Sequence, residues 1–233
     1  MTSLLSNVWP RLVIVEGIMG SGKSIATLDI AWQLNASDIA AIGITEGVAP
    51  HPIRFDWDEP WNEMPPTRLA KSSVAKWKSF VDAALTSDRI SIVDGQLFHG
   101  GLTSLFLLEA EFELMAAYCR EIVSAAAPLS PLLVYFRQTD VDKAICLICE
   151  ERGEDWVKYQ TNWKLESPYA KARHLAGVDG LIAVYREYRD LTDRLYHDLD
   201  IPKISIENSG REWASYDATI DRALMSAPQP CGS

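Results

Sequence analysis

The chain has 233 residues, of which 48% are hydrophobic and 23% are charged, a balance typical of a globular protein. This length predicts one α/β domain over residues 1–233. The formal net charge is −10, and a negative field slows the approach to a phosphate backbone, so we expect no nucleic-acid polymer as a partner. Free nucleotides stay compatible, because they bind through local contacts.

Four cysteines are present, and Cys146 and Cys149 form a C-x-x-C pattern within a run of helical character. We expect buried, reduced thiols, with a redox or metal role as the alternative. No basic segment followed by a long apolar stretch opens the chain, and no run approaches the roughly 18 apolar residues of a membrane-spanning helix. These features predict a cytoplasmic protein without a membrane partner.

Strand-like and helical segments alternate along the chain. Five apolar runs are predicted to be strands: Leu12–Glu16, Ile39–Thr45, Ile90–Asp94, Leu132–Phe136 and Lys203–Glu207. Their continuous apolar character is typical of parallel strands covered on both faces. Helical patterns span Lys23–Asn35, Arg68–Leu85, Thr103–Ala127, Asp140–Glu151, Val178–Leu199 and Glu212–Met225. The alternation predicts a three-layer α/β fold with a parallel five-stranded sheet.

The segment Gly17-Ile18-Met19-Gly20-Ser21-Gly22-Lys23-Ser24 follows the first strand directly and fits the P-loop pattern G-x-x-x-x-G-K-[S/T]. Glycines let backbone N–H groups converge on phosphate oxygens, and the helix that follows presents the positive end of its dipole. Lys23 is the candidate catalytic cation, and Ser24 is a candidate Mg²⁺ ligand. The motif predicts ATP and Mg²⁺ as cofactors. The expected ATP contacts are Gly17, Met19, Gly20, Ser21, Gly22, Lys23 and Ser24.

The stretch Ala49–Thr67 is rich in proline, tryptophan and acidic residues and is long for a plain connection. We expect a substrate loop over residues 46–67, with tryptophan for stacking and acids for charge. The alternative is a solvated loop whose tryptophans cover the core. The candidate substrate-binding residues of this loop are Glu46, His51, Arg54 and Trp57.

Asp94 ends the third predicted strand, and Gln96 and His99 follow it. In P-loop proteins an acid at this place holds Mg²⁺, often through water, or accepts the proton of an attacking hydroxyl. Both roles need a fixed negative charge near the γ-phosphate, so Asp94 is a candidate for catalysis and for the metal site. Gln96 and His99 are candidate substrate contacts, and a loop histidine satisfied by the backbone is the alternative for His99.

The helix predicted over Thr103–Ala127 carries an apolar stripe with spacings of three and four residues, which lines one helical face. The stripe consists of Leu105, Leu108, Phe112, Met115, Cys119, Ile122 and Ala126. We expect it to pack on the sheet, and a homodimer through helix 103–127 is the alternative.

On these motifs the chain resembles the P-loop nucleoside and nucleotide kinase-like group, which includes thymidylate kinases and small-metabolite or antibiotic kinases. The resemblance covers most of the chain in order and implies the sheet order 2-3-1-4-5. It implies that residues near Glu46 contact substrate and that Asn208 lies in an adenine loop. It also implies that the segment near 152–177 is a lid, in which Arg152 approaches the transferring phosphate as a catalytic residue. For Arg152 the alternative is a helix-end arginine favoured by the dipole.

We therefore expect an ATP-dependent phosphotransferase that acts on a hydroxyl of a small molecule, namely a metabolite, nucleoside or antibiotic. The chain has Asp94-Gly95-Gln96 where thymidylate kinases commonly carry Asp-Arg, and it lacks a crowded RxxxR lid pattern. An unphosphorylated acceptor is therefore preferred, with a nucleoside monophosphate kinase as the nearest alternative. A nucleotide-binding regulatory protein with slow ATPase activity is the alternative from another class. The NKxD motif of GTPases and the LSGGQ signature of ABC proteins are absent.

Overall fold

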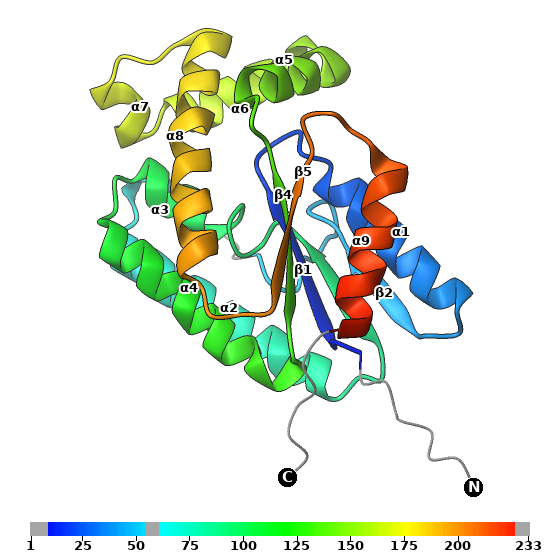
Figure 1. Ribbon diagram of the computed structural model, residues 1–233. Coiled ribbons are helices and arrows are strands. Elements are labelled where there is room, and N and C mark those ends of the chain that lie inside the picture. Colours follow the sequence, from blue (N-terminus) through cyan, green and yellow to red (C-terminus); the bar gives the residue numbers. More distant parts are fainter. Residues whose placement is uncertain (1–8, 55–60, 227–233) are drawn as a thin grey trace, which may run out of the picture.

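The computed structural model describes residues 9–54 and 61–226, so Trp57 and Cys231 lie outside the described residues. Five parallel strands form one sheet in the order β2-β3-β1-β4-β5, which confirms the predicted fold (Figure 1). Four strands match the prediction closely, whereas β2 is shorter than the predicted Ile39–Thr45. The strands are β1 (Leu12–Gly17), β2 (Ala41–Ile44), β3 (Ile90–Asp94), β4 (Leu132–Arg137) and β5 (Lys203–Glu207).

Helices cover both faces of the sheet. Figure 1 shows α1 and α9 on one side and α2, α3, α4 and α8 on the other, with α5, α6 and α7 beyond the carboxyl ends of the strands. Short 3-10 turns lie at Trp61–Glu63 and Ala127–Leu129. The helices are α1 (Lys23–Ala36), α2 (Pro66–Leu85), α3 (Gly101–Leu107), α4 (Phe112–Ala126), α5 (Val141–Arg152), α6 (Glu154–Leu165), α7 (Pro168–Ala172), α8 (Gly177–Asp198) and α9 (Trp213–Ser226).

The apolar runs of the strands feed two hydrophobic clusters, one on each face of the sheet. Leu12 and Ile14 of β1 point into the cluster formed with α2, α4 and α8. Val13 and Val15 point into the cluster formed with α1 and α9. Successive side chains of a strand face opposite sides, so both sets must be apolar when both faces are covered. This double coverage explains why β1 is continuously apolar.

The single helix predicted over Thr103–Ala127 is wrong, because α3 ends at Leu107 and α4 begins at Phe112. Between them Glu109 adopts the left-handed region with φ of 56°. Its carboxylate forms an ion pair at 2.6 Å with Arg173, which is distant in the sequence. The spacing of apolar residues along a helix cannot predict such a tertiary contact. Most of the apolar stripe packs within the chain: Leu105, Met115, Cys119, Ile122 and Ala126 are buried. A homodimer therefore stays a prediction without support from this stripe.

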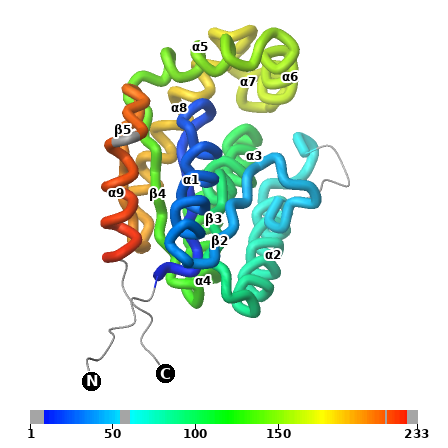
Figure 2. The backbone as a smooth tube through the Cα atoms, turned by 90° about the vertical axis from the view of Figure 1, so that its right-hand side faces the viewer, coloured from blue at the N-terminus to red at the C-terminus, as the bar shows by residue number. Residues whose placement is uncertain are grey.

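The lid-like segment near 152–177 contains two helices, α6 and α7, which the sequence analysis did not predict. Gly153, with φ of 80°, separates α6 from α5, and the Ser167 side chain caps α7 by accepting a hydrogen bond from the Ala170 N–H. Figure 2 shows α5, α6 and α7 gathered at the end of the molecule where α1 begins. The segment thus stands next to the P-loop.

Of the three cysteines within the described residues, Cys119 is buried as expected, whereas Cys146 is exposed and Cys149 is partly exposed. All three are free thiols. Cys119 lies on α4, and Cys146 and Cys149 lie on α5. No group of three or more His, Cys, Asp or Glu side chains within residues 9–54 and 61–226 is arranged to hold a metal ion.

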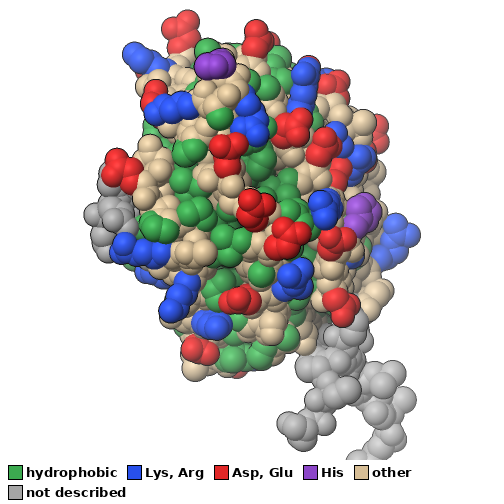
Figure 3. All heavy atoms as spheres, turned by 90° about the vertical axis from the view of Figure 1, so that its left-hand side faces the viewer, with side chains coloured by type: hydrophobic (Ala, Val, Ile, Leu, Met, Phe, Trp, Pro, Cys, Tyr) green, Lys and Arg blue, Asp and Glu red, His purple; other side chains and the backbone are tan. Residues whose placement is uncertain are grey.

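The described helices include none that is long and apolar enough to cross a membrane. On the face shown in Figure 3, acidic and basic side chains are interspersed and do not separate into patches of one sign. The absence of a nucleic-acid partner stays a prediction from the net charge.

Candidate phosphoryl-transfer site

The glycines of the P-loop occupy places where a side chain would collide with neighbours. Gly20 and Gly22 have φ of 78° and 85°, in the left-handed region that favours glycine. A Cβ on Gly22 would lie 2.0 Å from the ring of Trp213, and one on Gly17 would lie 2.6 Å from the carbonyl oxygen of Phe136. The loop can therefore follow this path only with glycine at these positions.

Helix α1 begins at Lys23, directly after this loop. Its N-cap, Gly22, makes no side-chain capping bond, so the first N–H groups of the helix have no side-chain cap at the positive end of the dipole. Lys23 is only 6% exposed, and its Nζ donates to the carbonyl oxygen of Ile18 at 3.2 Å. The loop, the helix start and the ammonium group together form a site suited to a polyphosphate.

Ser24, at the start of α1, meets Asp94, at the end of β3. The Ser24 hydroxyl donates to Asp94 Oδ2 at 2.5 Å, and Asp94 is fully buried at the end of β3, which pairs with β1. Burial raises the pKa of Asp94, whereas the Lys23 ammonium and the Ser24 hydroxyl lower it. Asp94 Oδ1 has no hydrogen-bond partner among the described residues. A hydroxyl and a carboxylate with an open oxygen are ligands that suit Mg²⁺.

Glu46 brings a second carboxylate to the same edge of the sheet. Its Oε1 lies 4.0 Å from Lys23 Nζ and 3.6 Å from Nε2 of His99. The Glu46 side chain is 41% exposed, whereas Asp94 is fully buried. Burial lowers the pKa of His99 well below its usual value, and the ammonium groups of Lys23 and Lys164 lower it further, so His99 is neutral at pH 7. Glu46 is therefore the carboxylate of this cluster that an incoming molecule can reach.

The lid-like segment places Lys164, and not Arg152, beside these residues. Lys164 of α6 is 1% exposed and interacts electrostatically with Glu46 and Lys23. Arg152 is exposed at the C-terminal end of α5, where a basic residue interacts favourably with the helix dipole. A catalytic role for Arg152 stays a prediction.

Asn208, expected in an adenine loop, lies against the P-loop. Its Nδ2 donates to the carbonyl oxygen of Ser21 at 2.7 Å, and its own backbone oxygen accepts from Gln138 at 3.1 Å. Trp213 at the start of α9 packs on Gly22 from the same side. The segment after β5 thus packs against Ser21 and Gly22 of the P-loop. A contact between Asn208 and adenine stays a prediction.

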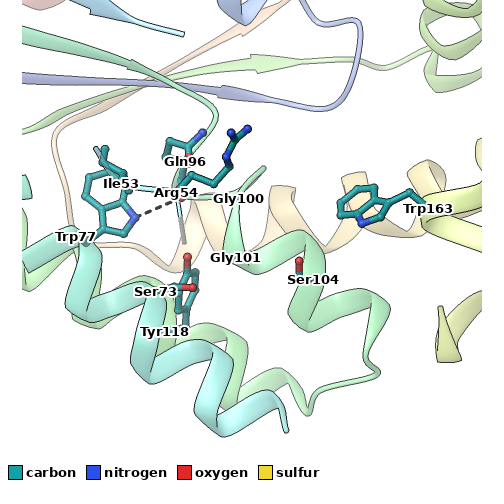
Figure 4. A pocket seen from close by; sticks show the side chains of 10 residues that line it. All are labelled: Ile53, Arg54, Ser73, Trp77, Gln96, Gly100, Gly101, Ser104, Tyr118 and Trp163. Atoms are coloured by element: carbon teal, nitrogen blue, oxygen red, sulfur yellow. Dashed lines mark hydrogen bonds between the residues drawn. The ribbon is translucent and has the colours of Figure 1, made fainter. Parts of the chain in front are cut away.

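A pocket with about 510 Å³ of empty space lies beside the cluster. Figure 4 shows Trp77 and Arg54 on one side of it and Trp163 on the other, with Tyr118 and Ser73 rising from the helices below. Its lining comes from α2, α3, α4 and α6 and from the loops after β2 and β3. The lining residues are Ile53, Arg54, Ser73, Trp77, Gln96, Gly100, Gly101, Ser104, Tyr118 and Trp163.

The remaining candidate substrate residues occupy distinct places. Arg54 and Gln96 line the pocket, and Arg54 Nη1 donates to the Glu46 backbone oxygen at 3.3 Å. Gln96 is buried, and its Nε2 donates to the Asp94 backbone oxygen at 3.2 Å. His51 is buried, and its Nδ1 accepts the N–H groups of Ile53 and Arg54, so it shapes the turn that carries Arg54.

Sequence reasoning missed Glu16, which lies in β1 immediately before the first glycine of the P-loop. It is fully buried, and its Oε1 accepts the N–H groups of Leu97 at 2.6 Å and Phe98 at 2.8 Å. Burial raises its pKa to about 8, against the opposing effect of these hydrogen bonds and of Lys23. Glu16 thus fixes the loop between Gln96 and His99. The available signal in the sequence was a single carboxylate directly after the apolar run of a predicted buried strand.

The aromatic wall of the pocket was also missed. Trp77, Tyr118 and Trp163 come from three helices that are distant in sequence, and no local pattern brings them together. Trp163 also contacts Trp61 of the substrate loop, with ring centroids 5.4 Å apart. This contact joins the substrate loop to the lid-like segment at the pocket.

The chain is similar to two solved structures of deoxyadenosine kinase from M.mycoides. The one with the products dCMP and a flexible dCDP bound is 14% identical, with a TM-score of 0.42, and the match covers 91% of this chain and 97% of that chain. The one with bound dATP is 13% identical, with a TM-score of 0.41 and coverage of 91% and 98%. No protein-family model and no curated protein matches the chain. A likeness at this TM-score carries no argument about the site, so the chain's own residues must support any function.

Proposed function

We propose that the protein is an ATP-dependent phosphotransferase that transfers the γ-phosphate to a hydroxyl of a small molecule. One observation carries the proposal: the P-loop Lys23, the Ser24–Asp94 pair and the reachable carboxylate Glu46 meet at one edge of the sheet, beside an aromatic pocket. The P-loop cluster would serve as the donor site, and the adjacent aromatic pocket would serve as the acceptor site. An ATPase without an acceptor has no need for the second site.

The donor half would bind the phosphates through the P-loop amides, the start of α1 and Lys23. Ser24 and Asp94 would hold Mg²⁺, which when bound neutralises charge on the phosphate oxygens. Because Asp94 is fully buried and already accepts the Ser24 hydroxyl, its geometry favours metal support over proton transfer from an acceptor.

Glu46 suits the proton transfer better, because its side chain is partly exposed between the P-loop lysine and the pocket loop that carries Arg54. In the reaction, a bond forms between the acceptor oxygen and the γ-phosphorus while the bond from that phosphorus to the β,γ-bridging oxygen breaks. The hydroxyl proton passes to the Glu46 carboxylate, and ADP leaves. Proton transfer of this kind contributes about 10²–10⁴-fold in rate.

The pocket favours a flat, uncharged acceptor such as a nucleoside over a polycationic antibiotic. Trp77, Tyr118 and Trp163 supply ring faces, and Gln96 supplies an amide. The charged side chain among the described lining residues is the Arg54 guanidinium, which repels a cation. Stacking and hydrogen bonding, with no carboxylate among these lining residues, are features that fit a heteroaromatic ring.

The test is ADP release from ATP and Mg²⁺, with and without a panel of nucleosides, hydroxylated metabolites and aminoglycosides. We expect ADP release to depend on a neutral aromatic acceptor and to match the phosphorylated product by mass spectrometry. Glu46→Gln should lower kcat about 100-fold, whereas Glu113→Gln, at an exposed position of α4, should not. ADP release that is independent of every acceptor would support the regulatory ATPase instead, and phosphorylation of nucleoside monophosphates alone would support the monophosphate kinase.

A further inference from the structure

Lys164 is buried in a way that packing alone does not explain. The residue is 1% exposed near the end of α6, and its Nζ donates to Gln160 Oε1 at 2.5 Å. The ammonium lies 4.1 Å from the ring centroid of Trp163 and 5.6 Å from that of Tyr185. No carboxylate lies within ion-pair distance of its Nζ among the described residues.

The surroundings of Lys164 locate it between the two halves of the candidate site. Trp163 lines the acceptor pocket. Tyr185 is the second ring near the ammonium, and its hydroxyl donates a hydrogen bond to Met19 Sδ of the P-loop at 3.6 Å. The two rings therefore connect the ammonium group to the pocket wall and to the phosphate-binding loop. Glu46, Lys23 and His99 are the charged or titratable groups whose fields couple to it.

This placement is costly for stability. An ion loses its hydration on burial, and a neutral amide acceptor with two aromatic rings offsets only part of that cost. Burial lowers the pKa of Lys164 to about 7, while Glu46 raises it and Lys23 lowers it further. A methionine would fill the same space without the penalty. An ammonium has three donors, and Gln160 accepts from it in this structure, so donors remain for a ligand.

We propose that Lys164 is a second active-site cation, supplied by α6, that contacts the phosphoryl group during its transfer. The proposal rests on the proposed phosphotransferase function. It assigns the phosphate-contacting cation of the lid-like segment to Lys164 rather than to Arg152. Lys23 would hold the phosphates from the P-loop, and Lys164 would meet the same group from the pocket side.

The test uses Lys164→Met, Lys164→Arg and the matched control Lys158→Met, which removes an exposed lysine of the same helix. Titration calorimetry measures binding of ADP alone and of ADP with aluminium fluoride, a mimic of the phosphoryl group in transfer, so no acceptor needs to be known. We expect Lys164→Met to weaken binding of the mimic at least tenfold, to leave binding of ADP unchanged and to keep or raise the melting temperature. Lys164→Arg should restore part of the lost affinity, because it keeps the charge.

The outcomes separate the two proposals. If Lys164→Met binds the mimic as tightly as the wild-type protein, or if its melting temperature falls with mimic binding unchanged, Lys164 is a structural residue and the inference is wrong. If the wild-type protein binds ADP with aluminium fluoride no more tightly than ADP, the phosphotransferase proposal itself fails. Lys158→Met should match the wild-type protein in every measurement, and a loss there would show that α6 responds to any lost charge.

Discussion

The two halves of the candidate site are built in different ways. The donor half consists of the ends of β1 and β3 and the start of α1, and its polar groups, Lys23 and Asp94, are almost completely buried. The acceptor half is assembled from four helices and two loops around an open pocket, and its carboxylate, Glu46, is 41% exposed. In the donor half, burial fixes the positions of the charged groups. In the acceptor half, the pocket is formed by side chains from several elements, so a single substitution can change its shape.

This difference has a consequence for mutation. In the donor half each side chain has a fixed electrostatic partner, so its removal should cost catalysis. In the acceptor half the contacts are aromatic surfaces, so their removal should cost affinity for the acceptor and leave ATP binding unchanged. Four substitutions test this division, ordered by the size of the expected effect.

The largest effect is expected for Lys23→Ala. Loss of one preorganised charge stabiliser lowers turnover by about 10²–10³-fold, and the fold should survive because α1 keeps its apolar face. Steady-state kinetics with circular dichroism checks this expectation. The exposed lysine of α2, Lys71, provides the control when changed to alanine. Normal turnover by folded Lys23→Ala protein would rule out the P-loop as the donor site.

Asp94→Asn should lower kcat by about 10²-fold with little change in melting temperature, because the amide keeps the size of the side chain and loses its charge. If Asp94 supports Mg²⁺ together with Ser24, higher Mg²⁺ should restore part of the activity. Kinetics over a Mg²⁺ series checks this. A defect that Mg²⁺ leaves untouched would assign Asp94 to proton transfer, and an unfolded variant would make it a structural residue.

Trp163→Leu should raise KM for the acceptor about fivefold, since a lost aromatic contact costs about 1 kcal/mol and a tenfold change in affinity needs about 1.4 kcal/mol. KM for ATP should stay as it is. Trp32→Leu serves as the control, because Trp32 is 69% exposed on α1. An equal rise in KM for both substrates would show that the two halves of the site are not separate.

The smallest effect on activity is expected at Glu16, whose substitution should change stability instead. Its pKa is about 8 in the folded protein and 4.5 in a model peptide, so between these values the folded state retains a proton that the unfolded chain releases. The stability contributed by this group is therefore lost as pH rises, by at most about 1.4 kcal/mol per pH unit. Urea unfolding at pH 5.5 and 7.5 should show that Glu16→Gln gains stability relative to wild type at the higher pH. A constant difference would mean that Glu16 does not retain this proton.

The fold and the donor half could be predicted from the sequence because their signals are local. The P-loop is one contiguous motif after a strand, and Asp94 closes a strand whose neighbour in the sheet is set by the fold. The strand order was implied by the resemblance to the P-loop kinase-like group, and that order brings Asp94 to the same sheet edge as Ser24.

The acceptor half could not be predicted, because its residues meet only through tertiary packing. Trp77, Tyr118 and Trp163 converge from three helices. The sequence around each of them is equally compatible with a residue of the hydrophobic core and with a residue of a pocket. The break at Glu109 depends on its ion pair with Arg173, and the burial of Lys164 depends on Trp163 and Tyr185. The spacing of residue types along the sequence does not predict these tertiary contacts.

The most direct test of the central claim is the fate of a labelled γ-phosphate. ATP labelled at the γ-phosphorus is mixed with the protein, Mg²⁺ and a nucleoside panel, and the products are separated into organic phosphate and inorganic phosphate. We predict that the label appears on the acceptor hydroxyl with the wild-type protein and with Lys71→Ala, and that it stays on ATP with Lys23→Ala. Label that collects only as inorganic phosphate, at the same rate with and without acceptor, would contradict the phosphotransferase function.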